Sequence, residues 1–334
     1  MIQQLIEGFI QQMEKAIDLG KNQRLKHKPQ DVRQLVVSGL GGSGIGANIA
    51  ESILQQELSI PFIIVKTYQI PQFVDAHTLF VASSFSGNTE ETLAAFQQAQ
   101  QRQAQIACIS AGGELLQQAE KNGYDFVQLP NEAPCPRAFL GYSLINLLYL
   151  LKNYGFISNA FEAQLQEAVA LLKTQKQHIH QEAKEIANAF YQKLPIVYAD
   201  SPWLPIITRL QQQVNENAKQ LCHTHVFPEM NHNELVGWGL SPELYAKTCI
   251  LMVRSNLDHP RTRLRFDICK PIFAEKAQQV IEAIPQGENF LTQCFYLIHL
   301  FDWVSWYLSE LNQVDAFEVQ VINNLKSALA KVPS

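Results

Sequence analysis

The stretch Gln34–Gly46 reads QLVVSGLGGSGIG, an apolar run that leads directly into a glycine-rich turn. The apolar run predicts a short strand, and residues 45–56, after the glycines, predict a helix. Glycines at such a junction let backbone N–H groups point into one concavity, where the helix dipole favours an anion. Gly41, Gly42 and Ser43 are therefore candidate phosphate ligands, although the glycines would also suit a tight turn that binds nothing.

A second turn of the same kind, SSFSGNTEET at residues 83–92, follows the apolar run TLFVAS. Asn88, with Glu91 three residues later, fits a capping box at the start of a helix. The capping box does not account for three further hydroxyl groups in the turn, those of Ser84, Ser86 and Thr89. Hydroxyl and free N–H groups together suit a phosphate monoester. Because both turns follow strands, we expect them side by side at the carboxyl edge of one sheet.

Short apolar runs alternate with helical segments in both halves of the chain. The predicted strands are residues 34–38, 61–66, 78–83, 105–110, 124–129, 195–199, 247–253 and 279–285. This alternation predicts an α/β fold, with right-handed crossovers, parallel sheets and helices on both faces. The length of 334 residues suits two domains, which we place at residues 1–155 and 156–334, with a helical connection starting near residue 155.

The bulk composition excludes several classes of partner. There are 26 basic and 31 acidic residues, a net charge of -5, which offers no basic surface for nucleic acid or an anionic membrane. Residues 144–151, the longest apolar stretch, are too few to span a bilayer. Residues 1–28 fit an amphipathic helix rather than a signal peptide. The six cysteines form no CxxC pair, which predicts free thiols in a reducing cytoplasm.

The two turns together, GGSG after the first strand and SxSGNTxET after the third, resemble the sugar isomerase domain, a family of phosphosugar-binding domains. Three more segments extend the resemblance over nearly the whole chain: PRA at 136–138, NENAK at 215–219 and PEMNHNELVGW at 228–238. With them the chain resembles the bifunctional phosphoglucose/phosphomannose isomerase family. The resemblance implies two flavodoxin-like domains. The implied activity is the interconversion of glucose 6-phosphate or mannose 6-phosphate with fructose 6-phosphate, without a cofactor.

The resemblance also implies which residues act on the hexose 6-phosphate. Glu216 matches the base that moves a proton between C1 and C2, a task that suits a partly desolvated carboxylate. His232 matches the group that opens the sugar ring, and a histidine titrates in the range needed for this. Arg137 matches the cation beside the developing enediolate, and Lys326 matches a late lysine on the final helix. The phosphate ligands fall on Ser43, Ser84, Ser86 and Thr89.

The resemblance further implies a homodimer, in which the ring-opening histidine reaches the site across the interface. Two departures from the family pattern stand out. Asp315-Ala316-Phe317 replaces the usual aspartate, proline and threonine, which leaves the balance between the glucose and mannose epimers open. Residues 199–203 read ADSPW where a glycine turn is usual, so we expect the second domain to hold no phosphate of its own.

Each candidate residue also has a simpler interpretation. Glu216 could be a helix-surface carboxylate, His232 a neighbour of the natural caps Asn231 and Asn233, and Arg137 part of a surface ion pair. Cys222, His223 and His225 could form a zinc site, but no carboxylate–histidine helix pattern accompanies them. A non-catalytic phosphosugar sensor is the rival function. It would not need Glu216, His232 and Arg137 together, and no helix-turn-helix segment is evident for a DNA-binding output.

Overall fold

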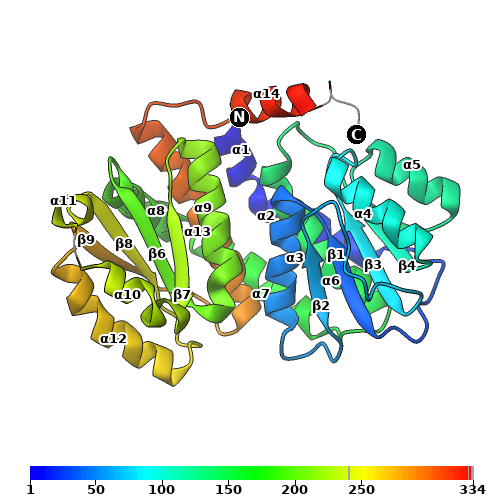
Figure 1. The fold of residues 1–334 in the computed structure, drawn as a ribbon, viewed down its shortest axis with the longest axis horizontal. Coiled ribbons are helices and arrows are strands. Elements are labelled where there is room, and N and C mark those ends of the chain that lie inside the picture. The colour runs from blue at the N-terminus through cyan, green and yellow to red at the C-terminus, as the bar shows by residue number, and fades with distance from the viewer. Residues whose placement is uncertain (240, 330, 332–334) are drawn as a thin grey trace. The chain divides into compact units, whose positions relative to one another are not determined.

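The described part of the chain, residues 1–239, 241–329 and 331, forms two units in this computed structural model (Figure 1). The N-terminal unit consists of Glu7–Lys173 and Gly287–Cys294. The C-terminal unit consists of Met1–Ile6, Thr174–Gln286 and Phe295–Ser334. Each unit is built around its own parallel sheet.

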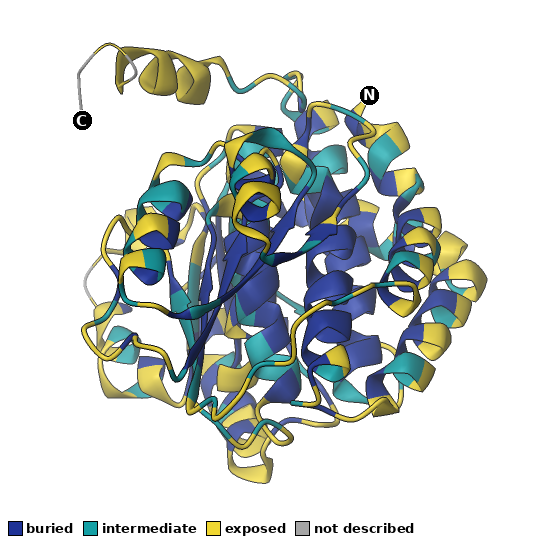
Figure 2. Ribbon diagram, turned by 90° about the vertical axis from the view of Figure 1, so that its right-hand side faces the viewer, coloured by how far each residue is buried: buried dark blue, intermediate teal, exposed yellow. Residues whose placement is uncertain are grey.

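The sheet of the N-terminal unit has the order β2-β1-β3-β4-β5, the flavodoxin order. Its strands are β1 Gln34–Ser38, β2 Phe62–Val65, β3 Thr78–Ser83, β4 Gln105–Ser110 and β5 Asp125–Gln128. All neighbouring pairs are parallel. The five strands predicted for this half are therefore confirmed, to within two residues at their ends. The central strands β1, β3 and β4 are almost entirely buried, as expected of a sheet covered on both faces (Figure 2).

Helices cover both faces of this sheet. The helices of this unit are α2 Phe9–Lys21, α3 Gly41–Leu54, α4 Glu90–Gln101, α5 Gly113–Asn122, the 3₁₀-helix η1 Pro136–Phe139, α6 Leu140–Asn153 and α7 Ala160–Thr174. The chain leaves β1 for β2 in one direction and passes from β3 to β5 in the other. Right-handed crossovers therefore place α3 on one face and α4 and α5 on the other. Helix α6 packs on α2 and α3.

The predicted helix over residues 1–28 is only partly correct. The chain breaks at Gly8 into α1 Ile2–Glu7 and α2, and α2 ends at Lys21. The backbone N–H groups of Lys26 and His27 then donate to the carboxylate of Asp125, at 2.7 and 3.0 Å. These bonds hold the following segment outside a helix, and they come from a residue about a hundred positions away.

The C-terminal unit has the strand order β7-β6-β8-β9, again entirely parallel. Its strands are β6 Leu194–Asp200, β7 His223–Phe227, β8 Thr248–Val253 and β9 Gln279–Ala283. Its helices are most of α1, α8 Lys176–Phe190, η2 Ser201–Trp203, α9 Leu204–Ala218, η3 Glu229–His232, α10 Glu234–Gly237, α11 Pro242–Tyr245, α12 Pro260–Ala274, the larger part of α13 Phe290–Leu311, and α14 Gln320–Leu329. With this second sheet, the predicted fold class of two parallel-sheet α/β domains is confirmed.

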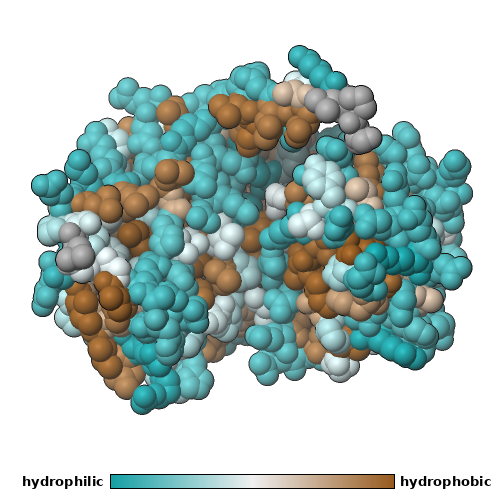
Figure 3. Space-filling view, viewed as in Figure 1, coloured by the Kyte–Doolittle hydropathy of each residue, from teal (hydrophilic) through white to brown (hydrophobic). Residues whose placement is uncertain are grey.

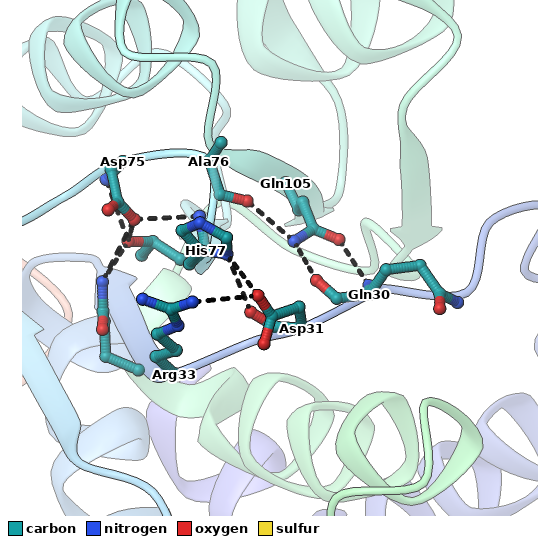
Figure 4. A network of polar contacts seen from close by, with 9 residues as sticks. Gln30, Asp31, Arg33, Asp75, Ala76, His77 and Gln105 are labelled. Carbon is teal, nitrogen blue, oxygen red and sulfur yellow. Dashed lines mark hydrogen bonds and ion pairs between the residues drawn. The ribbon is translucent and has the colours of Figure 1, made fainter.

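A polar network closes the amino edge of the N-terminal sheet (Figure 4). Gln105 and Gln30 exchange hydrogen bonds of 2.7 and 2.8 Å, and Gln105 also donates to the carbonyl of Ala76 at 2.9 Å. Asp31 pairs with Arg33 and His77 at 3.1 and 2.9 Å. These contacts fix the strand entrances at the end of the sheet opposite the two turns.

Two helices of the C-terminal unit expose apolar stripes. Leu264, Ile268 and Ile272 lie at four-residue spacing on α12. Val321, Leu325 and Leu329 do the same on α14, where Val321 is 83% exposed. Figure 3 shows brown surface over both helices. Among the described residues, no helix has the length and apolar character needed to cross a membrane.

Candidate active site

The glycine-rich turn after β1 is tightly packed and leads straight into α3. A Cβ atom on Gly39 would lie 2.8 Å from the carbonyl oxygen of Ser83, and one on Gly44 would lie 2.4 Å from that of Gly39. Only glycine fits at these two positions. Within the described chain, α3 has no side-chain cap at Leu40. The first-turn N–H groups of Gly41, Gly42 and Ser43 therefore have no partner within the helix, as an anion site requires.

The turn after β3 is organised around Ser84. Its hydroxyl lies 2.9 Å from that of Thr89 and accepts a hydrogen bond of 3.1 Å from the N–H of Gly87. Ser84 is buried, Thr89 half-buried and Ser86 exposed. Helix α4 begins after Thr89, which is its N-cap residue and makes no side-chain capping bond. The turn thus holds hydroxyl groups beside the first N–H groups of α4, which have no side-chain cap among the described residues.

The predicted capping box of Asn88 and Glu91 is wrong. Asn88 precedes the N-cap position, and its side-chain oxygen accepts a 2.9 Å hydrogen bond from the N–H of Glu114 in α5. Gly87 lies against the next turn, because a Cβ on it would come within 1.8 Å of the carbonyl oxygen of Gly112. Asn88 therefore ties the turn after β3 to the turn after β4.

Arg137 lies beside the glycine-rich turn. A Cβ on Gly42 would be 3.3 Å from the carbonyl oxygen of Pro136 and 3.6 Å from the Cα of Arg137. Phe139, two residues further on, stacks on Phe85 of the second turn with ring centroids 5.2 Å apart. Helix η1 therefore packs on both turns at once and brings the half-buried Arg137 to them.

A pocket of about 460 Å³ opens next to these turns, at the carboxyl edge of β3 and β4. It is lined by Phe85, Ser86, Asn88, Ala111, Gly112, Gly113, Asn131, Ala133, Pro134 and Pro136. Its volume is in the range of small-molecule sites. The N-terminal unit therefore combines two anion-suited turns, a cation and a cavity at one edge of its sheet.

The turn after β6, at the corresponding place in the second sheet, already contains an anion. The buried carboxylate of Asp200 accepts hydrogen bonds from the N–H of Ser201 at 2.9 Å, the N–H of His259 at 3.0 Å and the hydroxyl of Thr262 at 3.1 Å. His259 and Thr262 belong to the start of α12. Asp200 thus occupies donors that could otherwise bind a phosphate, which gives a physical reason for the expectation that this half holds none.

Glu216 lies near the end of α9 and is half-buried. It lines a largely apolar pocket of about 430 Å³ together with residues 318–322, which lead into α14. Lys219 closes the end of the helix: its ammonium group donates to the carbonyl oxygens of Glu216, Asp315 and Glu318, at 2.7, 2.9 and 2.6 Å. The NENAK segment therefore joins the end of α9 to the chain before α14.

His232 is exposed and lies at the end of η3. Its side chain makes no hydrogen bond or ion pair with any described residue. Its neighbours do: Asn233 accepts from the N–H of Glu234 at 2.6 Å, and Asn231 accepts from Arg265 at 3.0 Å. The two asparagines thus have polar partners, whereas the exposed side chain of His232 makes no polar contact with the described residues.

The alternative zinc cluster has a different arrangement. His223 contacts both carboxylate oxygens of Glu234, at 3.0 and 3.1 Å, and His225 lies 4.0 Å from the same carboxylate. Burial raises the pKa of Cys222 to about 12, which keeps its thiol protonated. Within the described residues, no three histidine, cysteine or acidic side chains are arranged to hold a metal ion.

Known proteins resemble this chain along almost its entire length. Residues 30–135 match the SIS domain, and residues 179–329 match the bacterial phospho-glucose isomerase C-terminal SIS domain. A bifunctional phosphoglucose/phosphomannose isomerase of Caldicellulosiruptor bescii is 37% identical, over 96% of this chain and 97% of its own. One from Aquifex aeolicus is 35% identical, over 99% and 98%.

The chain belongs to the bifunctional phosphoglucose/phosphomannose isomerase family. This confirms the family predicted from the GGSG, SxSGNTxET, NENAK and NHNE segments. The fold agrees with a solved structure, the C-terminal domain of glucosamine-fructose-6-phosphate aminotransferase from Francisella tularensis. That structure has a TM-score of 0.78 and 13% identity, and the match covers 95% of this chain and 98% of that one.

The family's candidate residues divide between the two units. The N-terminal unit brings together Gly41, Gly42, Ser43, Ser84, Ser86, Thr89 and Arg137. The C-terminal unit holds Glu216, His232 and Lys326 on three separate elements, with Lys326 exposed on α14. Glu216 and the start of α14 line one pocket, whereas His232 lies on the segment after β7.

Sequence reasoning missed one cation next to the glycine-rich turn. Lys66 directly follows β2, and its Cε would lie 3.2 Å from a Cβ on Gly44. Its ammonium group donates to the side-chain oxygen of Asn48 in α3, and partial burial lowers the pKa of Lys66. A charged residue at the carboxyl end of a strand beside β1 was the available signal, because this is the edge at which such sheets bind ligands.

Proposed function

We propose that this enzyme interconverts glucose 6-phosphate and mannose 6-phosphate with fructose 6-phosphate through a cis-enediol. The observation that carries the proposal is the carboxyl edge of the N-terminal sheet. There the first-turn N–H groups after Leu40, the Ser84–Thr89 hydroxyl pair and Arg137 adjoin one another, in a chain of the bifunctional isomerase family. Such a group of donors suits the phosphate of a sugar.

The proposed chemistry starts from the closed sugar ring. His232 moves the proton that opens the ring and releases the C1 carbonyl of the aldose. Glu216 then takes the proton from C2, the electron pair shifts to form the C1–C2 double bond, and Arg137 stabilises the charge on the enediolate oxygens. Protonation of C1 by Glu216 and transfer of the O2 proton to O1 give the ketose. For the mannose epimer, rotation about C2–C3 presents the other face to the same base.

The remaining assignments concern binding and assembly. Gly41, Gly42, Ser43, Ser84, Ser86 and Thr89 hold the phosphate, and Lys326 supplies a further positive charge from α14. Proton transfer within one molecule needs neither a metal nor a redox cofactor.

We also propose a homodimer that acts in the cytoplasm, in a step shared by glycolysis and gluconeogenesis. The apolar stripe of Val321, Leu325 and Leu329 on the helix that carries Lys326 supports a dimer. Sedimentation equilibrium measures the molar mass of the particle, and a mass equal to that of one chain would contradict the homodimer.

The decisive experiment is an assay with both aldose phosphates in the presence of a chelator. Glu216→Gln is expected to lower kcat by about 10²- to 10⁴-fold, with KM changed little, because it removes the base and keeps the shape of the side chain. Glu243→Gln, an exposed carboxylate on α11, is the matched control and should retain wild-type kcat.

Two outcomes would contradict the proposal. Full activity of the Glu216→Gln variant would remove this residue from proton transfer. Tight binding of both sugars by the wild type, without turnover of either, would favour the phosphosugar sensor instead.

A further inference from the structure

The segment Glu229–Trp238, which carries His232, is held in place by the polar side chains around that residue. Asn233 donates to the carboxylate of Glu229 at 2.9 Å and accepts from the N–H of Glu234 at 2.6 Å. Asn231 accepts from Arg265 of α12 at 3.0 Å. Every other polar side chain between residues 229 and 238 therefore has a partner within the described chain, whereas His232 has none there.

Glu234 is the anchor between this segment and the sheet. The hydroxyl of Tyr198, on β6, donates to one carboxylate oxygen at 2.5 Å. His223, on β7, lies 3.0 Å from the other oxygen. The indole N–H of Trp238 donates to the hydroxyl of Tyr198 at 3.1 Å, so both ends of α10 meet at the same tyrosine. Tyr198 and Trp238 belong to the buried core of this unit.

We propose that Glu234 and His223 are positioning residues, which fix the segment Glu229–Trp238 so that the imidazole of His232 is presented to the sugar ring. This inference rests on the proposed role of His232 in ring opening. It explains why the NHNE-VGW segment is longer than one catalytic histidine requires: Glu234 and Trp238 attach it to β6 and β7, and the two asparagines brace its turn.

The charges around Glu234 make this attachment sensitive to pH. The hydrogen bond to Glu234 raises the pKa of His223. Burial acts to raise the pKa of Glu234, but the bonds from His223 and Tyr198 outweigh it and lower the pKa overall. His225, from β7, also faces this carboxylate, and Tyr198, from β6, has its pKa raised by burial. As the pH rises through the pKa of His223, the attachment loses its charged donor and weakens.

The test is a double-mutant cycle between Glu234 and His232, assayed on glucose 6-phosphate. Glu234→Gln is expected to lower kcat about 10-fold, with KM nearly unchanged and a circular dichroism spectrum like that of the wild type. His232→Asn is expected to retain a slow turnover, because sugar phosphates also open spontaneously. In the His232→Asn background, the further substitution Glu234→Gln should change kcat less than 2-fold, since there is no histidine left to position.

His223→Gln provides a second variant that spares the core, because His223 is 47% exposed. It should lower kcat about 3-fold at pH 7, and it should remove the alkaline decline in kcat that titration of His223 causes in the wild type. Glu243→Gln serves again as the control with unchanged activity and pH profile.

The outcomes distinguish a failure of the positioning role of Glu234 and His223 from a failure of the proposed isomerase function. A loss from Glu234→Gln that is equally large with and without His232 would overturn the positioning role and leave the isomerase intact. Unchanged kcat in both the Glu234→Gln and His223→Gln variants would overturn it as well. Full activity of His232→Asn would instead remove the histidine from the proposed mechanism, and the positioning role with it.

Discussion

Asp258 is a buried carboxyl group in a place where ionisation is unfavourable. Its pKa is raised from 3.8 to about 6, chiefly by burial and also by the nearby charge of Asp200, against the opposing effect of the hydrogen bonds from Ser255 and Trp203. The folded state therefore binds this proton more tightly than the unfolded state does. The stabilisation is complete below pH 4 and is lost as the pH rises through about 6.

Asp258→Asn should remove this pH dependence. The free energy of unfolding of the wild type, relative to that of the variant, is expected to fall by about 3 kcal/mol between pH 3 and pH 7, since one pKa unit corresponds to about 1.4 kcal/mol. Urea unfolding at a series of pH values measures the difference. A difference that does not change with pH would contradict the raised pKa of Asp258.

The sequence could identify reactive residues, but not the residues with which they form hydrogen bonds in the folded chain. The residue types of Glu216 and His232 point to acid–base chemistry, that of Arg137 points to stabilisation of a negative charge, and the surrounding motifs identify the family. The contact of Asn88 with Glu114 and that of His223 with Glu234 link residues 26 and 11 positions apart. Local patterns therefore suggested a capping box and a zinc cluster, because the true partners come from other elements.

The turns after β3 and β4 interlock through two glycines with positive φ angles. Gly87 has a φ of 70°, and a Cβ on it would come within 1.8 Å of the carbonyl oxygen of Gly112. Gly113 has a φ of 71°, and a Cβ on it would come within 2.3 Å of the carbonyl oxygen of Ser86. Both positions thus require the absence of a side chain as well as a left-handed backbone.

Gly87→Ala is expected to lower the free energy of unfolding by about 3 kcal/mol or more, because strain and a clash with backbone add together. Gly123 is a matched control: its φ is also 70°, but nothing lies within 4 Å of an added Cβ. Gly123→Ala should therefore cost only about 1 kcal/mol. Chemical denaturation of both variants measures the difference, and equal losses would show that the contact with Gly112 is unimportant.

The strands that are apolar throughout were predicted, whereas β7, HTHVF at 223–227, is absent from the list of predicted strands because it mixes polar with apolar residues. A run such as TLFVAS is apolar throughout, as a strand buried on both faces must be. Helix α12, PRTRLRFDICKPIFA, was not predicted, since it contains Pro271 and mixes charged with apolar residues on its exposed side. The start of α3 was placed four residues too late, because glycines rarely open a helix unless a ligand or close packing requires it.

The two units of the molecule differ in whether a side chain of the chain itself binds the N–H groups at the corresponding turn. The N-terminal unit leaves the N–H groups at the start of α3 without a capping side chain, among the residues that the structure describes. The C-terminal unit supplies Asp200 at the corresponding turn. Binding of phosphate should therefore stabilise one unit and leave the other unaffected.

Amide hydrogen exchange, measured with and without inorganic phosphate, tests this expectation. With phosphate at about 100 times its Kd, amides of residues 41–44 and 84–89 that exchange only from the free state should slow by up to about 100-fold. Amides of residues 200–203 and 259–262 should keep their rates. Sodium chloride at equal ionic strength is the control, and slowed exchange at residues 200–203 would reveal a second anion site.

Asp200 also bears on how the two halves differ. The carboxylate of Asp200 is part of the chain, so it binds the hydrogen-bond donors of this turn at any concentration of phosphate compounds in the cell. A half with a tethered anion keeps its shape between catalytic cycles, whereas a half with an exchangeable one is free to gain and lose its occupant in every cycle. The aspartate after β6 therefore gives this half the role of a scaffold, with no exchangeable anion at the turn.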